Sequence, residues 1–463
     1  MLIEILDHNF SRIQLPLPKE LRELLSYKSG SFNHHTKRMK FTTNCVVEDT
    51  GVFLTGLVDF IKENYHQPIE VVDQRRFPDV TLQLPKLTDP VTGNSFEFRE
   101  YQIDYLVQAL KLRRMIFDSE TGSGKTAMMA SIIDCLGLPT QIIAPNKTIL
   151  AQLHKELSLL LPHIRFGTDR DGNVEESPYL IGLSGTLVKL PSQVSRQYKV
   201  TLVDESYTAA AKQTMDVILQ TNSPYRFGFA GNSKGRSDNR DLIVFGLLGN
   251  PVKLIDRKQL QEQGFSPEIQ LEIHRGWFGG EYHVLEDLLI VHNPKRNELI
   301  TSLVKAHAGR NKTILVLVQR REHGKILESM IPNSLFVFGD TEMDEREAVR
   351  QRMKQGTLKV LIASKVFAIG LDIPNLEIGI NAAGGKAEIL TGQRLGRVMR
   401  VWENTIKKWI DIDDSGYHSI LGRHSLERMR IYKEKQLKIN FVDFPPGMQK
   451  KLEDELIKND DSN

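Results

Sequence analysis

A glycine-rich turn between two apolar stretches restricts the fold of this chain more than any other feature. RRMIFDS (113–119) has the composition of a buried strand, SETGSGKT (119–126) holds the turn, and TAMMASIIDCL (126–136) has the pattern of a helix. A strand that passes through such a turn into a helix begins a βαβ unit. Such units require a parallel sheet with helices on its faces.

The same alternation of apolar runs and helical patterns continues along the chain. After the turn it includes QIIAP (141–145) and YKVTLVDES (198–206), and a second series covers KTILVLVQ (312–319), SLFVFG (334–339), KVLIAS (359–364) and IGINAAG (378–384). Two α/β domains with parallel sheets are therefore expected. Shorter strand-like and helical runs before them, such as RIQLPL (12–17) and TGLVDFIKENY (55–65), predict a small α+β domain.

We predict a division into four parts from these patterns. Residues 1–85 form the small α+β domain, 86–252 the first parallel-sheet domain, 253–440 the second with C-terminal helices, and 441–463 a polar tail. The proline-rich stretch at 72–94 is expected to connect the first two parts.

Composition excludes little. The chain of 463 residues has 61 basic and 58 acidic side chains, so a nucleic-acid footprint would have to be local. Cys45 and Cys135 are expected to be reduced thiols. Neither a secretory leader nor an apolar run of about 20 residues is visible, so a cytoplasmic protein is expected.

The turn has the residues of a phosphate cradle. Backbone N–H groups of a glycine-rich loop at a helix N-terminus approach phosphate oxygens closely. We expect nucleotide contacts from Thr121, Gly122, Ser123, Gly124, Lys125 and Thr126. Lys125 would reach the β- and γ-phosphates and Thr126 would ligate Mg²⁺, although Ser119 replaces the first glycine of the general pattern.

Asp204 and Glu205 follow the strand-like run YKVTLV, about eighty residues after the cradle. A phosphate-loop enzyme needs an acid at the end of a second strand to hold the magnesium, and a neighbouring carboxylate orients or deprotonates water. Asp204 is the expected metal ligand and Glu205 the expected water-handling residue. By itself such a pair is more often a solvated strand end.

Further motifs occur in an order that resembles the superfamily 2 helicases and translocases. They are R-E-Y-Q (99–102), APNKTILAQ (144–152), SGTLVK (184–189), GFAGNSK (228–234), LVLVQR (315–320), IASKVFAIGLDIP (362–374) and QRLGRVMR (393–400). FGFAGNSKGRSDNRDLIVFGLLG (227–249) and IDIDDSG (410–416) narrow the resemblance to the phage UvsW-type helicases. The fold so implied is two tandem RecA-like domains, an α/β class, after a small α+β domain.

The resemblance implies roles for several residues. Arg99 and Gln102 would contact the adenine, Gly370 and Asp372 would sense nucleotide, and Arg397 and Arg400, with Gln393 beside them, would act as catalytic arginine fingers. ATP and Mg²⁺ are the implied cofactors. The implied activity is ATP-driven 3′-to-5′ movement on DNA that remodels forks and four-way junctions, by a monomer or a weakly associating chain.

Candidate nucleic-acid contacts are polar residues at the matching motif positions and a basic, aromatic stretch near the N-terminus. The former are Asn146, Thr186, Gln319, Arg320 and Ser364, and the latter contributes Lys37 and Arg38 within SFNHHTKRMKF (31–41). Helix caps and a solvated hairpin are the respective structural alternatives. Trp277 and Phe278 would suit a role in separating strands, and buried packing explains these two aromatic residues equally well.

Two departures from the family pattern concern the coupling of hydrolysis to DNA. Ser206-Tyr207 replaces the usual Ala/Cys-His after the acidic pair, and Asn232-Ser233 stands where relatives have a Thr or Ser-Ala-Thr type sequence. Three other functions stay open at this point. They are a duplex translocase, an RNA helicase, and an annealing module with a vestigial ATPase.

Overall fold

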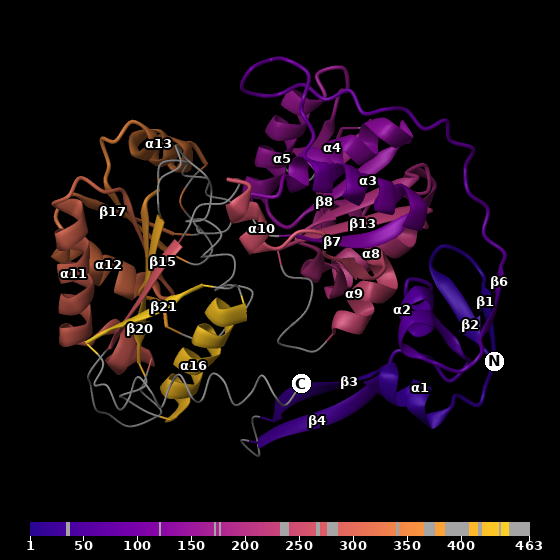
Figure 1. Cartoon of the computed structure of the whole chain (residues 1–463), viewed down its shortest axis with the longest axis horizontal. Coiled ribbons are helices and arrows are strands. Elements are labelled where there is room, and N and C mark those ends of the chain that lie inside the picture. The colour runs from indigo at the N-terminus through magenta and orange to yellow at the C-terminus, as the bar shows by residue number, and fades with distance from the viewer. Residues whose placement is uncertain are drawn as a thin grey trace. The chain divides into compact units, whose positions relative to one another are not determined.

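The computed structural model forms two compact units, Met1–Asp256 and Arg257–Asn463 (Figure 1). It describes residues 1–443 except 34–37, 120–121, 171–172, 176, 232–239, 265–268, 276–285, 339–340, 342, 365–375, 385–406, 415–418 and 435–436. Among the described residues, no helix is both long and apolar enough to cross a membrane.

The N-terminal part of the first unit contains a mixed sheet, a hairpin and two helices. The sheet has the order β5-β2-β1-β6, with strands Val52–Leu54, Phe10–Ile13, Leu2–Ile5 and Glu70–Asp73. The helices are α1 (Lys19–Leu24) and α2 (Leu57–Asn64), and the hairpin pairs β3 (Ser26–Asn33) with β4 (Arg38–Cys45). RIQLPL was expected to be a strand throughout, but the strand ends at Ile13, before Pro16 and Pro18, whose nitrogens carry no hydrogen to donate to a sheet.

A parallel sheet forms the centre of the first unit. Its order is β10-β9-β11-β8-β12-β13-β7-β14, and only the pairing of β10 with β9 is antiparallel. The strands are β7 (Arg114–Asp118), β8 (Thr140–Ala144), β9 (Gly167–Arg170), β10 (Asn173–Val174), β11 (Tyr179–Leu183), β12 (Val200–Asp204), β13 (Tyr225–Ala230) and β14 (Pro251–Val252). The side chains of β8 and β13 are buried throughout, as expected for strands covered on both faces.

Helices cover this sheet in two groups. One contains α3 (Glu100–Leu112), α4 (Lys125–Leu136) and α5 (Lys147–Leu160), which pack in series, and the other contains α6 (Ser184–Leu187), α7 (Ser192–Ser195), α8 (Lys212–Thr221) and α9 (Asp241–Leu248). Helix α4 ends at Gly137, whose φ of 59° gives the left-handed C-cap that glycine adopts most readily. The strand–turn–helix predicted at 113–136 is therefore confirmed.

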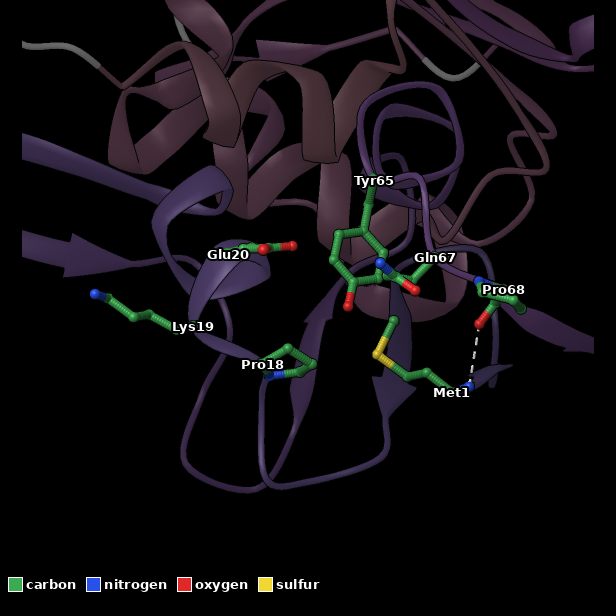
Figure 2. A pocket seen from close by; sticks show the side chains of 7 residues that line it. All are labelled: Met1, Pro18, Lys19, Glu20, Tyr65, Gln67 and Pro68. Carbon is green, nitrogen blue, oxygen red and sulfur yellow. Dashed lines mark hydrogen bonds between the residues drawn. The ribbon is translucent and has the colours of Figure 1, made fainter.

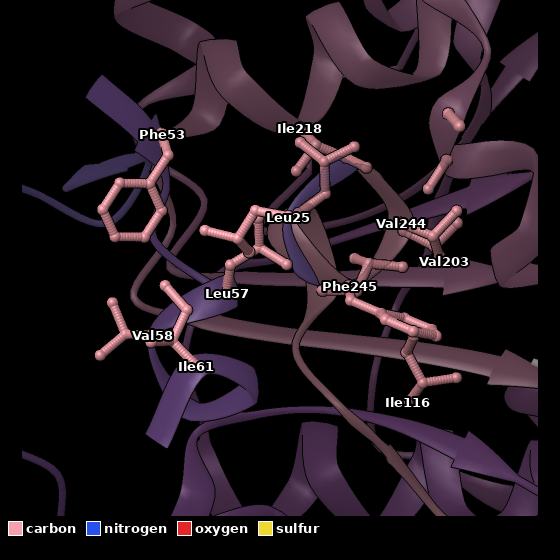
Figure 3. Close-up of a cluster of buried hydrophobic side chains, with 14 of the residues drawn as sticks. Leu25, Phe53, Leu57, Val58, Ile61, Ile116, Val203, Ile218, Val244 and Phe245 are labelled. Carbon is pink, nitrogen blue, oxygen red and sulfur yellow. The ribbon is translucent and has the colours of Figure 1, made fainter. Parts of the chain in front are cut away.

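The N-terminal sheet and the parallel sheet share one hydrophobic core. Leu25, Phe53, Leu57, Val58 and Ile61 lie in the same buried cluster as Ile116, Val203, Ile218, Val244 and Phe245 (Figure 3). At this junction the backbones approach closely, because Gly56 N donates to Gly246 O over 2.9 Å. A Cβ on Gly56 would lie 2.3 Å from Phe245 O, so a side chain cannot be accommodated there.

Two buried arginines also join the N-terminal part to the parallel sheet. Arg226, fully buried at the start of β13, donates to Asn9 Oδ1 and to Ser223 O, while Arg114 on β7 donates to His8 O. Burial lowers the pKa of both guanidinium groups, that of Arg114 to about 9. Hydrogen bonds to neutral oxygens thus compensate two desolvated cations at this seam.

The second unit is built on a sheet of seven described strands, all parallel. The order is β17-β18-β16-β19-β20-β15-β21, with strands Ser334–Val337, Val360–Ser364, Ile314–Val318, Ile378–Asn381, Lys407–Asp413, Ile269–Arg275 and Ile439–Val442. The described helices are α10 (Arg257–Glu262), α11 (Pro294–Ala308), α12 (Arg321–Met330), α13 (Met343–Lys354) and α16 (Ser419–Glu434), with a π-helical segment at Glu286–Val291.

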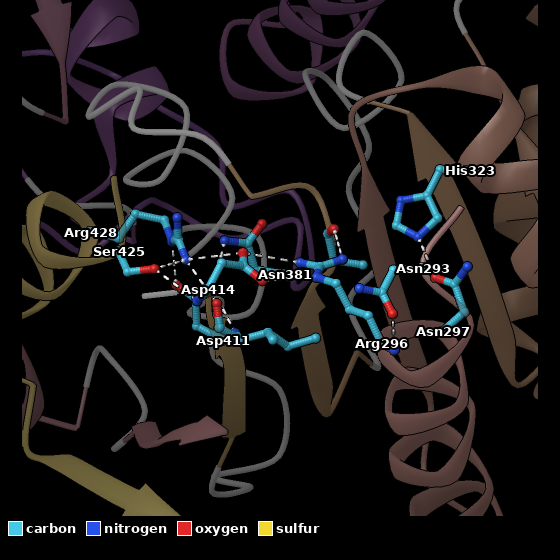
Figure 4. Close-up of polar contacts among 11 residues, drawn as sticks. Asn293, Arg296, Asn297, His323, Asn381, Asp411, Asp414, Ser425 and Arg428 are labelled. Atoms are coloured by element: carbon cyan, nitrogen blue, oxygen red, sulfur yellow. Dashed lines mark hydrogen bonds and ion pairs between the residues drawn. The ribbon is translucent and has the colours of Figure 1, made fainter. Parts of the chain in front are cut away.

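A buried ionic network holds the end of β20 in the second unit (Figure 4). Asp411 accepts hydrogen bonds from Arg428 Nε at 2.8 Å and from Tyr432 Oη at 2.6 Å, and Asp414 accepts from Arg296 Nε at 2.9 Å. Asn381 at the end of β19 also donates to Asp411, over 3.1 Å. The acidic run IDIDD thus ties α11 and α16 to the strand ends.

The fold class predicted from the sequence is confirmed, with two parallel-sheet α/β units and a mixed sheet at the N-terminus. The division at residues 85, 252 and 440 stays a prediction. Residues 1–85 share their core with the first parallel sheet, and the polar tail at 441–463 lies almost wholly outside the described residues.

Replacing Asn9 by Ala should destabilise the first unit. The change removes an acceptor from buried Arg226 and a donor, Asn9 Nδ2, that reaches Leu219 O over 2.7 Å. A buried donor left without a partner costs about 1–3 kcal/mol. Thermal unfolding followed by circular dichroism measures the loss, and Asn64→Ala, at an exposed residue of α2, is the control. Equal unfolding temperatures for the two variants would contradict a stabilising role of the seam.

Candidate nucleotide site

The glycine-rich turn lies at the carboxyl end of β7 and leads into α4. Its described glycines have left-handed backbones, with φ of 90° at Gly122 and 86° at Gly124. Ser119 N donates to Ala230 O at the end of neighbouring β13, over 3.0 Å, and so anchors the start of the turn. Thr121 lies outside the described residues. The turn therefore presents backbone at a helix N-terminus, as a phosphate cradle requires.

The serine that replaces the first glycine of the pattern fits the turn. Ser119 is buried, and its hydroxyl accepts from Ser123 Oγ over 3.0 Å. Its carbonyl oxygen accepts from Lys125 Nζ, also over 3.0 Å. This hydrogen bond holds the expected phosphate-binding ammonium across its own loop.

Side chains of the R-x-Y-Q element donate hydrogen bonds to backbone carbonyls of the glycine-rich turn. Gln102 Nε2 and Tyr101 Oη both donate to Ser123 O over 3.0 Å, and Arg99 donates to Gly122 O at the same distance. A Cβ on Gly124 would lie 2.3 Å from Gln102 Nε2, so this glycine admits the glutamine. The element, remote from the turn in sequence, supports its shape. Adenine contact by Arg99 and Gln102 stays a prediction.

Asp204 and Glu205 lie at the same edge of the sheet. Asp204 ends β12 and is in register with Phe229 of β13, whose next residue, Ala230, is in register with Asp118 of β7. Glu205 has a left-handed φ of 54°, which ends the strand sharply. Burial, then the charge of Glu205, raise the pKa of Asp204 to about 7, while Lys125 opposes the shift.

Ser206 occupies a packing position. Its side chain is fully buried at the start of the 3₁₀-helix Ser206–Ala210, and a Cβ on Gly228 would lie 2.7 Å from Ser206 Cβ. The Ser206 hydroxyl has no hydrogen-bond partner among the described residues. Gly228 of β13 therefore leaves no room for a side chain of its own against Ser206. Tyr207 follows as a half-buried residue.

Glu156, on α5, is a site residue that the sequence patterns did not identify. Its carboxylate accepts from Thr126 Oγ1 over 2.9 Å and from Gln152 Nε2 over 2.7 Å. A carboxylate four residues after a glutamine on a helix is an ordinary pattern, so only proximity to Thr126 gives it meaning. Three carboxylates and Lys125 thus share one neighbourhood, since the charge of Glu156 also affects Asp204.

The donor set fits Mg²⁺ bound together with a nucleotide. Magnesium is usually held by one or two protein oxygens plus phosphates and water, not by a protein cage. The Thr126 hydroxyl and the Asp204 carboxylate are such oxygens. Among the described residues no cluster of three or more His, Cys, Asp or Glu side chains is arranged to hold a metal ion by itself.

The candidate nucleic-acid residues have varied surroundings. Asn146 caps α5, because its side chain accepts from Ile149 N over 3.0 Å, and Thr186 lies in α6. In the second unit, Gln319 and Arg320 are exposed between β16 and α12, whereas Ser364 is buried at the end of β18. The hydrogen bond from Ile149 N supports the helix-cap alternative for Asn146.

Several predicted residues lie outside the described part of the chain. They are Lys37, Asn232, Ser233, Trp277, Phe278, Gly370, Asp372, Gln393, Arg397 and Arg400. Arg38 begins β4, and its backbone pairs with Asn33. A catalytic or nucleic-acid role for these residues stays a prediction.

An open pocket of about 600 Å³ lies on the N-terminal part of the first unit (Figure 2). Met1, Pro18, Lys19, Glu20, Tyr65, Gln67 and Pro68 line it. None of these is a predicted site residue, so the pocket is separate from the phosphate cradle.

Comparison with protein families matches both units. Residues 95–233 match the family described as type III restriction enzyme, res subunit, and residues 295–401 match the helicase conserved C-terminal domain. Together the matches cover just over half of the chain. They include the cradle, the acidic pair and the segment of the predicted arginine fingers.

Individual relatives have low sequence identity to this chain but align over most of its length. The ATP-dependent DNA helicase uvsW of Enterobacteria phage T4 is 23% identical over 95% of this chain and 98% of its own. Putative helicase 22 of a Sulfolobus islandicus filamentous virus is 25% identical over 89% of this chain and 79% of its own. Among solved structures, S. cerevisiae Dbp5 bound to RNA and ADP BeF3 is similar in fold, with 16% identity, a TM-score of 0.54, and 77% and 95% coverage.

Replacing Asp204 by Asn should stabilise the metal-free protein, and more so at high pH. The Asp204 carboxyl has a pKa of about 7 in the folded protein and of 3.8 in the unfolded chain. The free energy of unfolding of the wild-type protein therefore falls as pH rises between these values, by up to about 1.4 kcal/mol per pH unit. Asparagine resembles the protonated acid and escapes this loss. Unfolding temperatures in EDTA at pH 5.5 and 8.5 should show the larger gain at pH 8.5.

Asp89→Asn is the control for this measurement. Hydrogen bonds from Thr92 N and Val91 N lower the pKa of Asp89, so its removal should not stabilise the protein at either pH. A lower unfolding temperature of Asp204→Asn at pH 8.5 would contradict the assigned electrostatics.

Proposed function

Because this chain belongs to the superfamily 2 helicases and is an ATP-hydrolysing enzyme that acts on nucleic acid, we propose that it unwinds and remodels branched DNA. The single observation that carries the proposal is the extent of the likeness to the phage T4 DNA helicase, which includes the N-terminal part as well as both motor units. We further propose 3′-to-5′ movement, and a role in phage replication, recombination and repair.

The chemistry of the proposed ATP site follows from its geometry. Lys125, which donates to Ser119 O, would bind phosphate oxygens, and the turn would offer them backbone N–H groups at the start of α4. Thr126 and Asp204 would hold Mg²⁺, which neutralises phosphate charge when bound. Glu205, at the sharp end of β12, is the candidate to orient the attacking water.

The proposal assigns Arg397, Arg400 and Gln393 to stabilisation of charge on the transferring phosphoryl group, and Gly370 and Asp372 to nucleotide sensing. It assigns nucleic-acid contacts to Asn146, Thr186, Gln319, Arg320 and Ser364. Support comes from the place of these residues in the matched families and motif series.

Replacing Lys125 by Ala should reduce ATP hydrolysis at least about a hundredfold, because it removes a preorganised charge from the phosphates.

Hydrolysis should be measured with a DNA fork, a four-way junction, a tailed duplex and a fork made of RNA. The wild-type enzyme should be stimulated by DNA and should unwind branched DNA faster than the tailed duplex. Preference for the RNA fork would instead favour an RNA helicase, and hydrolysis at the wild-type rate in Lys125→Ala would refute the site.

The hairpin of β3 and β4 is proposed to grip the DNA backbone near a branch. Its strands pair over their full length, Arg38 begins β4, and the basic residue Lys37 precedes it in the sequence. Deleting residues 1–85 would expose the core shared with the parallel sheet, so point changes provide the cleaner test.

Replacing both Lys37 and Arg38 by Ser should weaken fork binding. The slope of the logarithm of the binding constant against the logarithm of the salt concentration should become less steep by about two, one for each lost phosphate contact. Binding should be measured by fluorescence anisotropy over a salt series, with Lys19→Ser, at an exposed lysine of α1, as the control. An unchanged slope in the double variant would rule out phosphate contact by these two residues.

A further inference from the structure

Thr126 and Glu156 connect the first turn of α4 to α5 beside the acidic pair. Thr126 Oγ1 donates to Glu156 Oε2 over 2.9 Å, and Gln152 Nε2, one turn earlier on α5, donates to Glu156 Oε1 over 2.7 Å. Each carboxylate oxygen thus has its own donor. The glutamine orients the carboxylate, and the carboxylate orients the threonine hydroxyl.

The direction of this hydrogen bond matters for a cation. A hydroxyl has one proton to donate and two lone pairs that can bind a metal. Because Glu156 takes the proton, Thr126 does not direct it at Asp204, and the lone pairs of Thr126 stay available. The oxygens of Asp204 are likewise left free of this hydroxyl.

The arrangement also concentrates negative charge. Glu156, held by Thr126 and Gln152, interacts electrostatically with Asp204, as Glu205 does. The three carboxylates outnumber the one ammonium of Lys125, so a divalent cation that approaches them relieves the repulsion between them. Metal-free ATP brings further negative charge and meets that repulsion.

We propose that Glu156 is a positioning residue that makes the nucleotide site select Mg²⁺–ATP over metal-free ATP. The inference rests on the proposed ATP site and deepens it. Glu156 acts through Thr126, whose hydroxyl it orients, and through its charge. Gln152 acts through Glu156.

The test measures nucleotide affinity, not turnover. Binding of a fluorescent, non-hydrolysable ATP analogue is titrated in 5 mM Mg²⁺ and in EDTA, and the ratio of the two affinities gives the contribution of the metal. In Glu156→Ala this ratio should fall roughly tenfold or more, since groups that orient metal ligands typically contribute 10–100-fold to metal affinity. Affinity in EDTA should stay constant or rise, because a negative charge has been removed.

Glu156→Gln is the conservative variant. A glutamine has one carbonyl oxygen, so it cannot accept from Thr126 and Gln152 as the two carboxylate oxygens do. Its ratio should therefore fall as well, with little change in packing, and this keeps the test valid should Glu156→Ala fail to fold. Gln152→Ala should lower the ratio less. Glu23→Gln, at an exposed carboxylate of α1, should leave it unchanged.

A double variant separates orientation from general packing. Thr126→Val alone should lower the ratio, and adding Glu156→Ala should lower it further by much less than Glu156→Ala does alone. An unchanged ratio in Glu156→Ala and Glu156→Gln would overturn the inference, as would equal losses with and without Mg²⁺. Failure of the wild-type chain to bind the analogue at all would instead overturn the proposed ATP site.

Discussion

Parallel pairing of β7, β13 and β12 is the constraint on which the candidate site depends. Parallel neighbours place their carboxyl ends at one edge of a sheet, and the register aligns Asp118 with Ala230 and Phe229 with Asp204. Residues about eighty positions apart in the sequence therefore lie at the same edge of the sheet. Glycines with left-handed backbones in the turn, and the left-handed Glu205 after β12, then direct backbone N–H groups and carboxylates to that edge.

The N-terminal part is built into the first unit and shares its core with the parallel sheet. Gly56 and Gly246 allow the two backbones to come into contact, and apolar side chains from both parts form one core. Arg114 and Arg226 donate hydrogen bonds to oxygens of the N-terminal part and to local carbonyls. Separation would expose apolar surface and remove hydrogen-bond acceptors of both guanidinium groups. The base of the β3–β4 hairpin also packs against this shared core, through Leu25 and Cys45.

Much of this structure could be predicted because it depends on local patterns. Short β-branched and apolar runs such as ILVLV and VTLVD favour strands covered on both faces, and SETGSGKT between strand and helix favours a phosphate-binding turn. Other features depend on residues that have no recognisable spacing. Glu156 meets Thr126 because α5 packs on α4, and Gly228 of β13 has no room for a side chain because it faces Ser206. Buried Arg226 looked like any basic residue at a strand start.

The sequence by itself determined the fold class, the order of the motifs and the chemical identity of the cradle and the acidic pair, since hydrophobic period and turn chemistry act over a few neighbouring residues. Only the tertiary structure decided which partners those residues have. It assigned the Thr126 proton to Glu156, the Lys125 ammonium to Ser119 O, and the R-x-Y-Q side chains to the carbonyls of the turn. Such choices follow from packing between elements distant in sequence, where distances of about 3 Å determine which hydrogen bonds form.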